Sequence, residues 1–270
     1  MTKFKIYCFT IERLNLLNKL PPNILPFGLG RNKFPVNWYN EKNGKNIMHL
    51  NKHFGEATGM YWLWKNKFND LLENDWVGFC QHRRFWLDDL YHKNHDSNEN
   101  IYSKLLTDKT PLFDKHDVIL LQPTKLKNET ILEHFINNHG EKIILESFNL
   151  LEKQISNDFQ VYLQKREFSV CNMFITKPKF FFDYCKFLFP FMDKILDFCL
   201  KNNLCQGKNI RLPIFFIERF TSFWFHRNMN VGYLSYAALN KYFTSNLINK
   251  YYNPLKTPRS FKLFPSILDV

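Results

Sequence analysis

Short apolar runs recur along the chain and predict the strands of a sheet. Residues 4–9 alternate between polar and apolar side chains, whereas residues 75–80, 117–121 and 168–176 are mainly apolar runs bounded by polar residues. Apolar runs of this length are typical of strands that are buried on both faces. Residues 20–30 contain three prolines and two glycines, and we expect them to form a loop.

Longer segments between these runs have the apolar spacing of helices. Residues 53–68 bring their apolar side chains to one helical face, and residues 145–160 and 213–225 also have helical character. We expect residues 180–200 to form one helix broken at Pro190 or a pair of helices. Strands that alternate with helices in this way favour an α/β sheet.

Two polar segments suggest how the chain is organised. Residues 88–110 are rich in histidine, asparagine and aspartate and predict an excursion over the surface. From Lys241 onward the chain carries five basic residues against a single acidic one, Asp269. We therefore predict one domain over residues 1–235 and a basic, aromatic and helical C-terminal extension over residues 236–270.

The composition is that of a compact cytoplasmic protein. The chain has 270 residues, is 45% hydrophobic and contains 29 phenylalanines, which excludes a disordered linker protein. Its six cysteines include no CxxC pair and no cluster with zinc-ligand spacing, so we expect reduced, mostly buried thiols. Glu12 interrupts the N-terminal stretch before a signal peptide can form, and no apolar stretch reaches the roughly 20 residues of a membrane span.

The positive charge lies mainly in the C-terminal part of the chain. The net charge is +12, and residues 1–160 hold 21 basic and 19 acidic side chains, whereas residues 161–270 hold 16 and 6. A basic field of this kind favours an acidic partner, which could be anionic lipid headgroups, a phosphorylated substrate or a nucleic acid. Charge alone does not choose among them.

The most informative polar residues directly follow the strand predicted at 75–80. Gln81, His82, Arg83 and Arg84 then lie at the carboxyl end of that strand, which is where ligands bind in open α/β sheets. The two arginines could be a structural pair. Alternatively they clamp a pyrophosphate, because a guanidinium binds phosphate oxygens in a bidentate manner and stays charged. His82 would then assist the leaving group or simply pack.

Two charged residues interrupt the apolar helix predicted at 213–225. Glu218 and Arg219 could form a structural ion pair, since a buried carboxylate is costly unless it is paired. The functional alternative is that Glu218 deprotonates a hydroxyl group, because apolar surroundings raise a carboxyl pKa toward the range of a general base. The spacing does not decide between these interpretations.

Two further sets of polar residues have both a structural and a binding interpretation. Asn172 lies inside an apolar run and is either a satisfied core amide or a donor to substrate. Asn51, Glu56 and Thr58 lie at a helix start, where they either cap the helix or contact a nucleotide.

Gly28 and Gly30 are a third candidate for donor binding. They form a glycine pair that lacks the third glycine of the dinucleotide-binding fingerprint, and this is weak evidence for a phosphate-binding loop.

At these residues the chain resembles a bacterial family of cytoplasmic sugar transferases that assemble capsular polysaccharide and lipopolysaccharide, with galactosyl- and galactofuranosyltransferase-like members. The resemblance spans most of the chain and depends on five blocks in order. These are Asn51 with GEATGMYWLWKN, then DWVGFCQHRRFW, HDVILLQP, VCNMFITKPKFFFDYCKFLF and IERFTSFWF. Family members usually carry His-Tyr-Arg-Arg where this chain has Gln81 to Arg84, so the arginines match and the histidine is shifted.

The resemblance implies a GT-A-like single Rossmann-related sheet flanked by helices. It also implies transfer of galactose or galactofuranose from a UDP-sugar to a hydroxyl of a growing capsule, O-antigen or lipooligosaccharide glycan, with inversion favoured. In this interpretation Glu218 is the base, Arg83 and Arg84 stabilise departing UDP, and Asn172 and Arg219 contact sugar or acceptor. Many GT-A enzymes place a metal-binding Asp-x-Asp where this chain has His82 and the arginines, so we expect no metal cofactor, with a divalent metal at 88–89 as the alternative.

Three expectations concern partners. The basic C-terminal segment would hold the enzyme at the anionic inner face of the cytoplasmic membrane, or it is a solvated tail. A basic nucleic-acid-binding module could use the same charge and aromatic content, but most of the aromatic residues lie in core-like runs, and we expect no nucleic acid partner. A non-catalytic scaffold of polysaccharide assembly is the other alternative.

Overall fold

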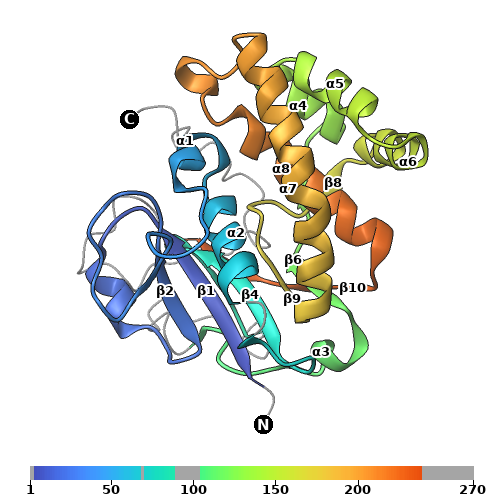
Figure 1. Cartoon of the computed structure of the whole chain (residues 1–270). Coiled ribbons are helices and arrows are strands. Elements are labelled where there is room, and N and C mark those ends of the chain that lie inside the picture. The colour runs from blue at the N-terminus through green and yellow to red at the C-terminus, as the bar shows by residue number, and fades with distance from the viewer. Residues whose placement is uncertain (1–2, 68–69, 89–103, 239–270) are drawn as a thin grey trace.

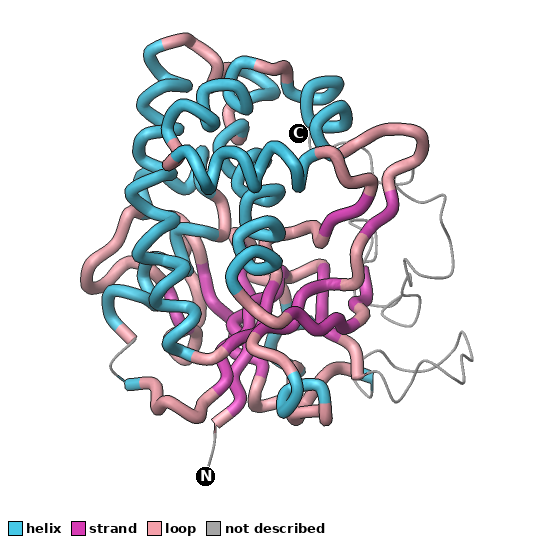
Figure 2. The backbone as a smooth tube through the Cα atoms, turned by 90° about the vertical axis from the view of Figure 1, so that its right-hand side faces the viewer, coloured by secondary structure: helices cyan, strands magenta, loops and turns pink. Residues whose placement is uncertain are grey.

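A central sheet and a layer of helices make up the computed structural model, which describes residues 3–67, 70–88 and 104–238. Figure 1 shows α4, α5 and α6 at the end of the molecule opposite the N-terminus, with α7 and α8 running between them and the sheet. In Figure 2 the helices lie mostly above and to one side of the strands. The predicted α/β sheet flanked by helices is confirmed.

The main sheet has the strand order β10-β6-β9-β4-β1-β2-β3. Its strands are β1 (Phe4–Thr10), β2 (Ile24–Gly28), β3 (Tyr39–Asn40), β4 (Trp76–Gln81), β6 (Val118–Leu121), β9 (Phe174–Thr176) and β10 (Val231–Leu234). β9 is antiparallel to both of its neighbours, and the other strands of this series all point in one direction. β5 (Arg84–Trp86) pairs antiparallel with both β4 and β11 (Tyr236–Ala238), and β7 (Thr124–Lys125) with β8 (Glu167–Phe168) forms a separate pair.

The helices lie between and after these strands. They are α1 (Asn51–Phe54), α2 (Ala57–Asn66), α3 (Leu112–Lys115), α4 (Ile131–His139), α5 (Lys142–Leu150), α6 (Lys153–Leu163), α7 (Pro178–Lys201) and α8 (Leu212–Asn228), with the 3-10 turns η1 (Asn15–Lys19), η2 (Met48–Leu50) and η6 (Gly207–Asn209). Within the described residues no helix has the length and hydropathy needed to cross a bilayer.

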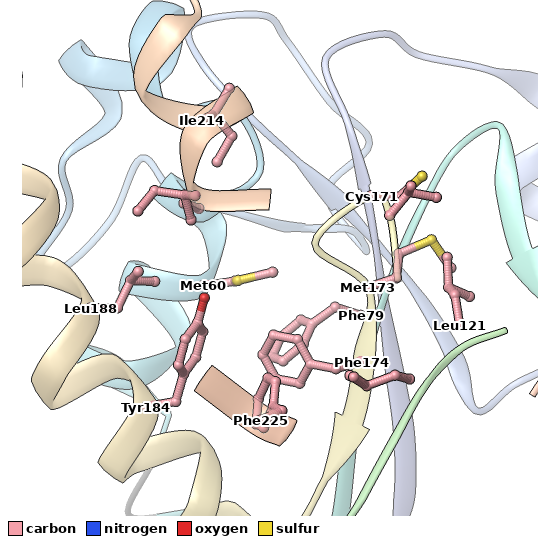
Figure 3. Packing of buried hydrophobic residues seen from close by; sticks show 14 of the residues in the cluster. Met60, Phe79, Leu121, Cys171, Met173, Phe174, Tyr184, Leu188, Ile214 and Phe225 are labelled. Atoms are coloured by element: carbon pink, nitrogen blue, oxygen red, sulfur yellow. The ribbon is translucent and has the colours of Figure 1, made fainter. Parts of the chain in front are cut away.

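The core of the sheet is aromatic. The ring of Phe79 on β4 stacks on Phe9 at 5.7 Å and meets Phe174 and Phe181 at 4.8 and 5.1 Å. Figure 3 shows Phe79, Phe174 and Phe225 together in this core. Such ring pairs add to the stabilisation that burial itself gives. Close packing also explains Gly78, since a Cβ there would lie 2.9 Å from the side chain of Ile175.

Several predicted elements are confirmed. The strands expected at 4–9, 75–80 and 117–121 are β1, β4 and β6, and the helix expected at 213–225 is α8, with a proline in its first turn. All six cysteines are buried and free, in agreement with the prediction of reduced thiols: Cys8, Cys80, Cys171, Cys185, Cys199 and Cys205.

The loop predicted at residues 20–30 is wrong, because it contains β2. Ile24 and Phe27 are buried and β2 pairs with β1 along its whole length. Pro26 lies opposite Cys8, while β3 pairs only with Phe27 and Gly28 on the other side of β2. A proline is tolerated here because its missing N–H lies in a part of the strand without a second neighbour.

Three helix predictions differ from the structure in continuity. The helix predicted at 53–68 is interrupted at Gly55, whose φ is +49°, and its last residue lies outside the described part of the chain. The helix predicted at 145–160 is two helices, because Leu151 adopts an extended conformation between α5 and α6. The break considered at Pro190 does not occur, and α7 continues through this exposed proline.

The predicted surface excursion at 88–110 is correct only in part. Leu105 and Leu106 within it are buried, and Leu105 bridges to Leu87. Residues 89–103 lie outside the described part of the chain. So do residues 239–270, which make up nearly all of the predicted C-terminal extension, whereas β11 places residues 236–238 in the main sheet.

Candidate active site

Several predicted site residues meet at one edge of the main sheet. β1, β2 and β4 end at this edge, and the turn before the antiparallel strand β9 reaches the same place. Gln81 is the last residue of β4, and Arg84 is the first residue of β5. This is the edge at which open α/β sheets bind ligands.

Glu56 is at the centre of this edge, at the start of α2. Its Oε1 accepts hydrogen bonds from Gln81 Nε2 at 3.3 Å and from Asn172 Nδ2 at 3.0 Å. Its Oε2 lies 3.6 Å from Arg211 Nη2, and its side chain is only 10% exposed. Residues from three separate segments therefore fix the position of one carboxylate.

Gln81 connects this carboxylate to the arginine pair. Its Nε2 also donates to the carbonyl of Cys171 at 3.0 Å, and its Oε1 accepts from Arg84 Nη1 at 2.6 Å. Because its amide contacts α2, β5 and the turn before β9, Gln81 holds these three segments at the end of β4 in a single arrangement.

Asn172 is held from behind by α8 and α7. Thr221 Oγ1 donates to Asn172 Oδ1 at 2.8 Å, and Tyr184 Oη lies 2.6 Å from the same hydroxyl. This fixes which end of the Asn172 amide faces Glu56. Asn172 is thus a satisfied buried amide and a direct partner of the site carboxylate.

The turn that carries Asn172 has an unusual backbone. Cys171 and Asn172 have φ values of +78° and +47°, in the left-handed region that residues other than glycine seldom adopt. This turn explains why the continuous strand predicted at 168–176 is wrong and is replaced by β8 and β9. Strained backbone of this kind persists where surrounding contacts impose it, and it is concentrated at functional sites.

Glu218 closes the site on the side of α8. Its Oε1 accepts a hydrogen bond from the backbone N–H of Cys171, and its Oε2 lies 2.8 Å from Arg219 Nη1. The Glu218 side chain is 21% exposed, so its carboxylate is accessible as well as paired.

Arg219 points away from this edge into the helical layer. It is 4% exposed, and it also contacts the Phe215 carbonyl at 2.9 Å and His134 Nδ1 at 3.1 Å. Its guanidinium lies between the rings of Phe135 and Phe168, at 5.5 and 5.0 Å from their centres. Burial, and after it the charge of Arg219, lowers the pKa of His134.

The positive charges near β4 are only partly compensated. Burial, and after it the charge of Arg84, lowers the pKa of Arg83, and Arg211 acts in the same direction. Glu12 opposes this shift. Since these arginines repel one another, an anion that bound between them would be stabilised.

His82 is neutral at physiological pH. Its backbone N–H donates to the Phe9 carbonyl at 3.0 Å, which fixes the turn after β4. Burial, and after it the charge of Arg83, lowers the pKa of its ring to about 4.

The glycine pair lies at the end of β2, beside a different buried carboxylate. A Cβ on Gly28 would lie 2.1 Å from the ring of Phe34, so close packing requires this glycine. Gly30 has a φ of +73°, and its N–H donates to Glu41 Oε1 at 2.6 Å. Glu41 is fully buried, and burial raises the pKa of its carboxyl.

Asn51 and Thr58 stabilise the break between α1 and α2. Asn51 Nδ2 donates to the Gly55 carbonyl and to Thr58 Oγ1, both at 3.0 Å, and Thr58 Oγ1 contacts the same carbonyl. These contacts hold the turn that presents Glu56 to the site.

The structure adds residues that the sequence interpretation missed. Arg211 forms an ion pair with Glu56, and Thr221 and Tyr184 belong to the hydrogen-bonded set behind Asn172. A signal existed for Arg211, a cation directly before the Leu212-Pro213 start of a helix. No sequence signal distinguished Thr221 or Tyr184 from the apolar helices around them.

The described residues contain no group of three or more histidine, cysteine, aspartate or glutamate side chains that could hold a metal ion. Of the aspartate pair at 88–89, only Asp88 lies within the described part of the chain.

Comparisons with known proteins identify the family and the fold. The model of the family described as "Domain of unknown function (DUF4422)" matches residues 5–229. A solved apo structure of the bifunctional glycosyltransferase WbbM aligns with a TM-score of 0.69 at 20% identity, over 89% of this chain and 46% of that chain. A search of the curated proteins finds no match. The predicted GT-A-like α/β fold is confirmed, and the chain spans somewhat less than half of the WbbM chain.

Proposed function

From the premise that the chain belongs to the DUF4422 family and has a GT-A-like glycosyltransferase fold, we propose that it transfers a sugar from a nucleotide diphosphate donor to a glycan hydroxyl. The observation that carries the proposal is the juxtaposition at the end of β4, where Arg84 donates to Gln81 and acts electrostatically on the fixed carboxylates of Glu56 and Glu218, with Arg83 next to it in the chain. A departing nucleoside diphosphate needs cations, and an acceptor hydroxyl needs a base.

The arginines have the chemistry for the leaving group. A guanidinium stays charged at any physiological pH and binds phosphate oxygens with two parallel hydrogen bonds. Arg83 and Arg84 provide two such groups in sequence, and Arg211 adds a third cation that faces Glu56. We therefore propose transfer that needs no divalent metal.

The proposed step is a direct displacement at the anomeric carbon. The acceptor oxygen forms a bond to that carbon while its proton passes to Glu218. The bond from the anomeric carbon to the diphosphate oxygen breaks, and its electron pair leaves with the nucleotide. One such displacement inverts the anomeric configuration.

Glu218 is the better of the two carboxylates for this role. Glu56 Oε1 already accepts two hydrogen bonds and its Oε2 faces Arg211, whereas each oxygen of Glu218 has one donor. The Glu218 side chain is also the more exposed, at 21% against 10% for Glu56. We assign Glu56 and Asn172 to positioning the donor sugar, and Arg219 to holding Glu218.

The donor and the acceptor follow from the sequence resemblance. A UDP-sugar is the proposed donor, with galactose or galactofuranose favoured, and a capsule, O-antigen or lipooligosaccharide glycan is the proposed acceptor. Gly28, Gly30, Asn51 and Thr58 would lie on the nucleotide side of the site, where Glu41 holds the Gly30 N–H and thereby the loop after β2. The basic segment from Lys241 would bring a cytoplasmic enzyme to an anionic membrane.

Release of UDP from a panel of UDP-sugars tests this proposal. The panel includes the pyranose and furanose forms of galactose, with a bacterial glycan acceptor, and each reaction is run with and without EDTA. We expect turnover of at least one donor that EDTA leaves unchanged. Activity lost with EDTA and restored by manganese would refute the arginine clamp, and no turnover with any donor would favour the scaffold.

A further inference from the structure

A second positively charged site lies beside the proposed active site. It is a groove of about 540 Å³, which we call the basic groove, lined by Lys125, Leu126, Lys165, Arg166 and Glu167. Its volume is within the range of roughly 300–1,000 Å³ that small-molecule sites occupy. The groove lies on β7, β8 and the residues that flank them, and Figure 1 shows β8 between the helices α4 to α6 and the main sheet.

Backbone hydrogen bonds hold the walls of the basic groove in place. Lys125 is paired with Glu167 across the two short strands, and Leu126 N–H donates to the Arg166 carbonyl at 2.7 Å. The N–H of Ile131 donates to the Lys165 carbonyl at 2.8 Å, which ties the same segment to the start of α4. The cations therefore project from a fixed scaffold.

The charge of the groove is only partly balanced by carboxylates, because Glu167 lines it and Arg166 acts electrostatically on Glu133. Three cations line it against one carboxylate, and Lys125, Lys165 and Arg166 form no salt bridge with any carboxylate in the described part of the chain. Lys165 Nζ lies 5.2 Å from the centre of the Tyr162 ring, which orients its side chain. Cations that are held in place but form no salt bridge attract an anion.

The groove is connected to the active site by a short, fixed segment. β8 leads directly into Ser169, whose Oγ donates to the Leu121 carbonyl at 2.6 Å and whose N–H contacts Ser222 Oγ at 3.1 Å. Two residues later, the N–H of Cys171 donates to Glu218. Cys171 is four positions after Glu167, so the groove begins within roughly 14 Å of the residue whose N–H binds the proposed base.

We infer that the basic groove binds a phosphate group of the acceptor, so that the enzyme recognises a phosphorylated glycan. This inference rests on the proposed transferase function. Lys125, Lys165 and Arg166 would hold the phosphate, while the Ser169–Asn172 segment directs the glycan toward Glu218. Recognition by the groove would act on acceptor binding and leave the donor reaction unchanged.

Binding of inorganic pyrophosphate tests the groove directly. The full chain is first saturated with UDP to fill the donor site, and pyrophosphate is then titrated by calorimetry into wild type, K165A/R166A and the control K179A/K186A. The control lysines are exposed residues of α7. We expect at least a tenfold loss of affinity in K165A/R166A and less than a twofold change in the control, with unchanged thermal unfolding in both.

Kinetics with two synthetic acceptors test the role in transfer. One glycan carries a phosphate at its reducing end and the other does not, and UDP release without acceptor reports the donor reaction. For K165A/R166A we expect KM for the phosphorylated glycan to rise at least tenfold, while kcat, KM for the unphosphorylated glycan and donor hydrolysis stay unchanged.

The outcomes separate this inference from the proposed function. If donor hydrolysis is active and wild type and K165A/R166A bind pyrophosphate with the same affinity, the inference that the basic groove binds phosphate is wrong. Pyrophosphate binding at the groove without turnover of any UDP-sugar would overturn the transferase, and the acceptor assignment with it. If K165A/R166A lost binding to phosphatidylglycerol vesicles but kept its KM for the phosphorylated glycan, the groove would be a membrane contact and the inference would be wrong.

Discussion

Arg219 and Arg83 illustrate two kinds of arginine environment in this protein. Arg219 is 4% exposed and contacts a carboxylate, a carbonyl and a histidine. Arg83 is half-buried, and the structure gives it no hydrogen bond or ion pair with any described residue. An arginine whose partners are all internal stabilises the fold, whereas one that lacks such partners is available to a ligand.

The same contrast separates Arg219 from its neighbour Glu218. A helix turns by about 100° per residue, so adjacent side chains point to different surroundings. Glu218 faces the sheet edge and Arg219 faces α4. The pair therefore joins the catalytic edge to the helical layer, and the two residues should respond differently to substitution.

Replacement of Arg219 should have the largest effect, and this effect is on the stability of the fold. Replacement of Arg219 by methionine leaves Glu218 without its ion-pair partner in a mostly buried position, and such losses cost about 3–5 kcal/mol of the free energy of unfolding. Urea unfolding followed by circular dichroism measures this cost. Arg83→Met is the matched control, with an expected change of about 0.5 kcal/mol or less. Equal losses in the two variants would remove the distinction between the environments.

Replacement of the proposed base should have the second largest effect, and this effect is on kcat. Glu218→Gln keeps the shape of the side chain but cannot accept the proton, so we expect kcat to fall on the order of 10³-fold. The rate of UDP release with acceptor measures it, and Glu56→Gln is the comparison. A larger kcat loss in Glu56→Gln than in Glu218→Gln would move the base to Glu56.

Replacement of an arginine of the proposed clamp should lower kcat less than replacement of Glu218. Arg83→Ala should lower kcat by about 10²-fold, because one group that stabilises developing charge is removed. Stability should change little, since Arg83 forms no hydrogen bond or ion pair with any described residue. Unchanged steady-state kinetics in this variant would take Arg83 out of the site.

Two histidines beside these arginines should make stability depend on pH. Burial lowers the pKa of His82 and of His139 to about 4 from 6.5, and next to burial the largest contribution comes from Arg83 for His82 and from Arg219 for His139. Between these pH values the unfolded chain binds protons that the folded chain does not. Stability is therefore full above pH 6.5 and falls toward pH 4, by at most about 1.4 kcal/mol per pH unit for each histidine.

Urea unfolding from pH 7 to pH 4 measures this slope. His82→Gln and His139→Gln should each flatten it, and the double variant should flatten it most. A slope that is the same in wild type and in the double variant would contradict the assigned shifts.

Sequence patterns predicted the parts of the fold where one interaction dominates. β1, β4 and β6 are strands buried over most of their length, so the alternation in β1 and the apolar runs in β4 and β6 were sufficient. β2 was missed because Pro26 lies where β3 does not pair, and that depends on how far a neighbouring strand extends. The turn at Cys171 and Asn172 was missed because contacts from distant segments impose its left-handed backbone.

The candidate site was predicted to a similar degree. Because Arg83 and Arg84 directly follow a predicted strand, the sequence was enough to place them at the sheet edge. Glu56, Asn172 and Glu218 also lie at this edge. The orientation of Arg219 away from the edge, and the contribution of Arg211, depend on how α8 is rotated against α1 and α4. No local pattern carries that information.

Selective binding of the diphosphate group tests the central claim most directly. Calorimetric titration of UDP and of uridine into wild type and R83A/R84A, all in the presence of EDTA, compares the two ligands in each protein. We predict that wild type binds UDP at least tenfold more tightly than uridine and that the double variant loses most of this preference. The same preference for UDP in both proteins would contradict the assignment of Arg83 and Arg84 as the diphosphate clamp.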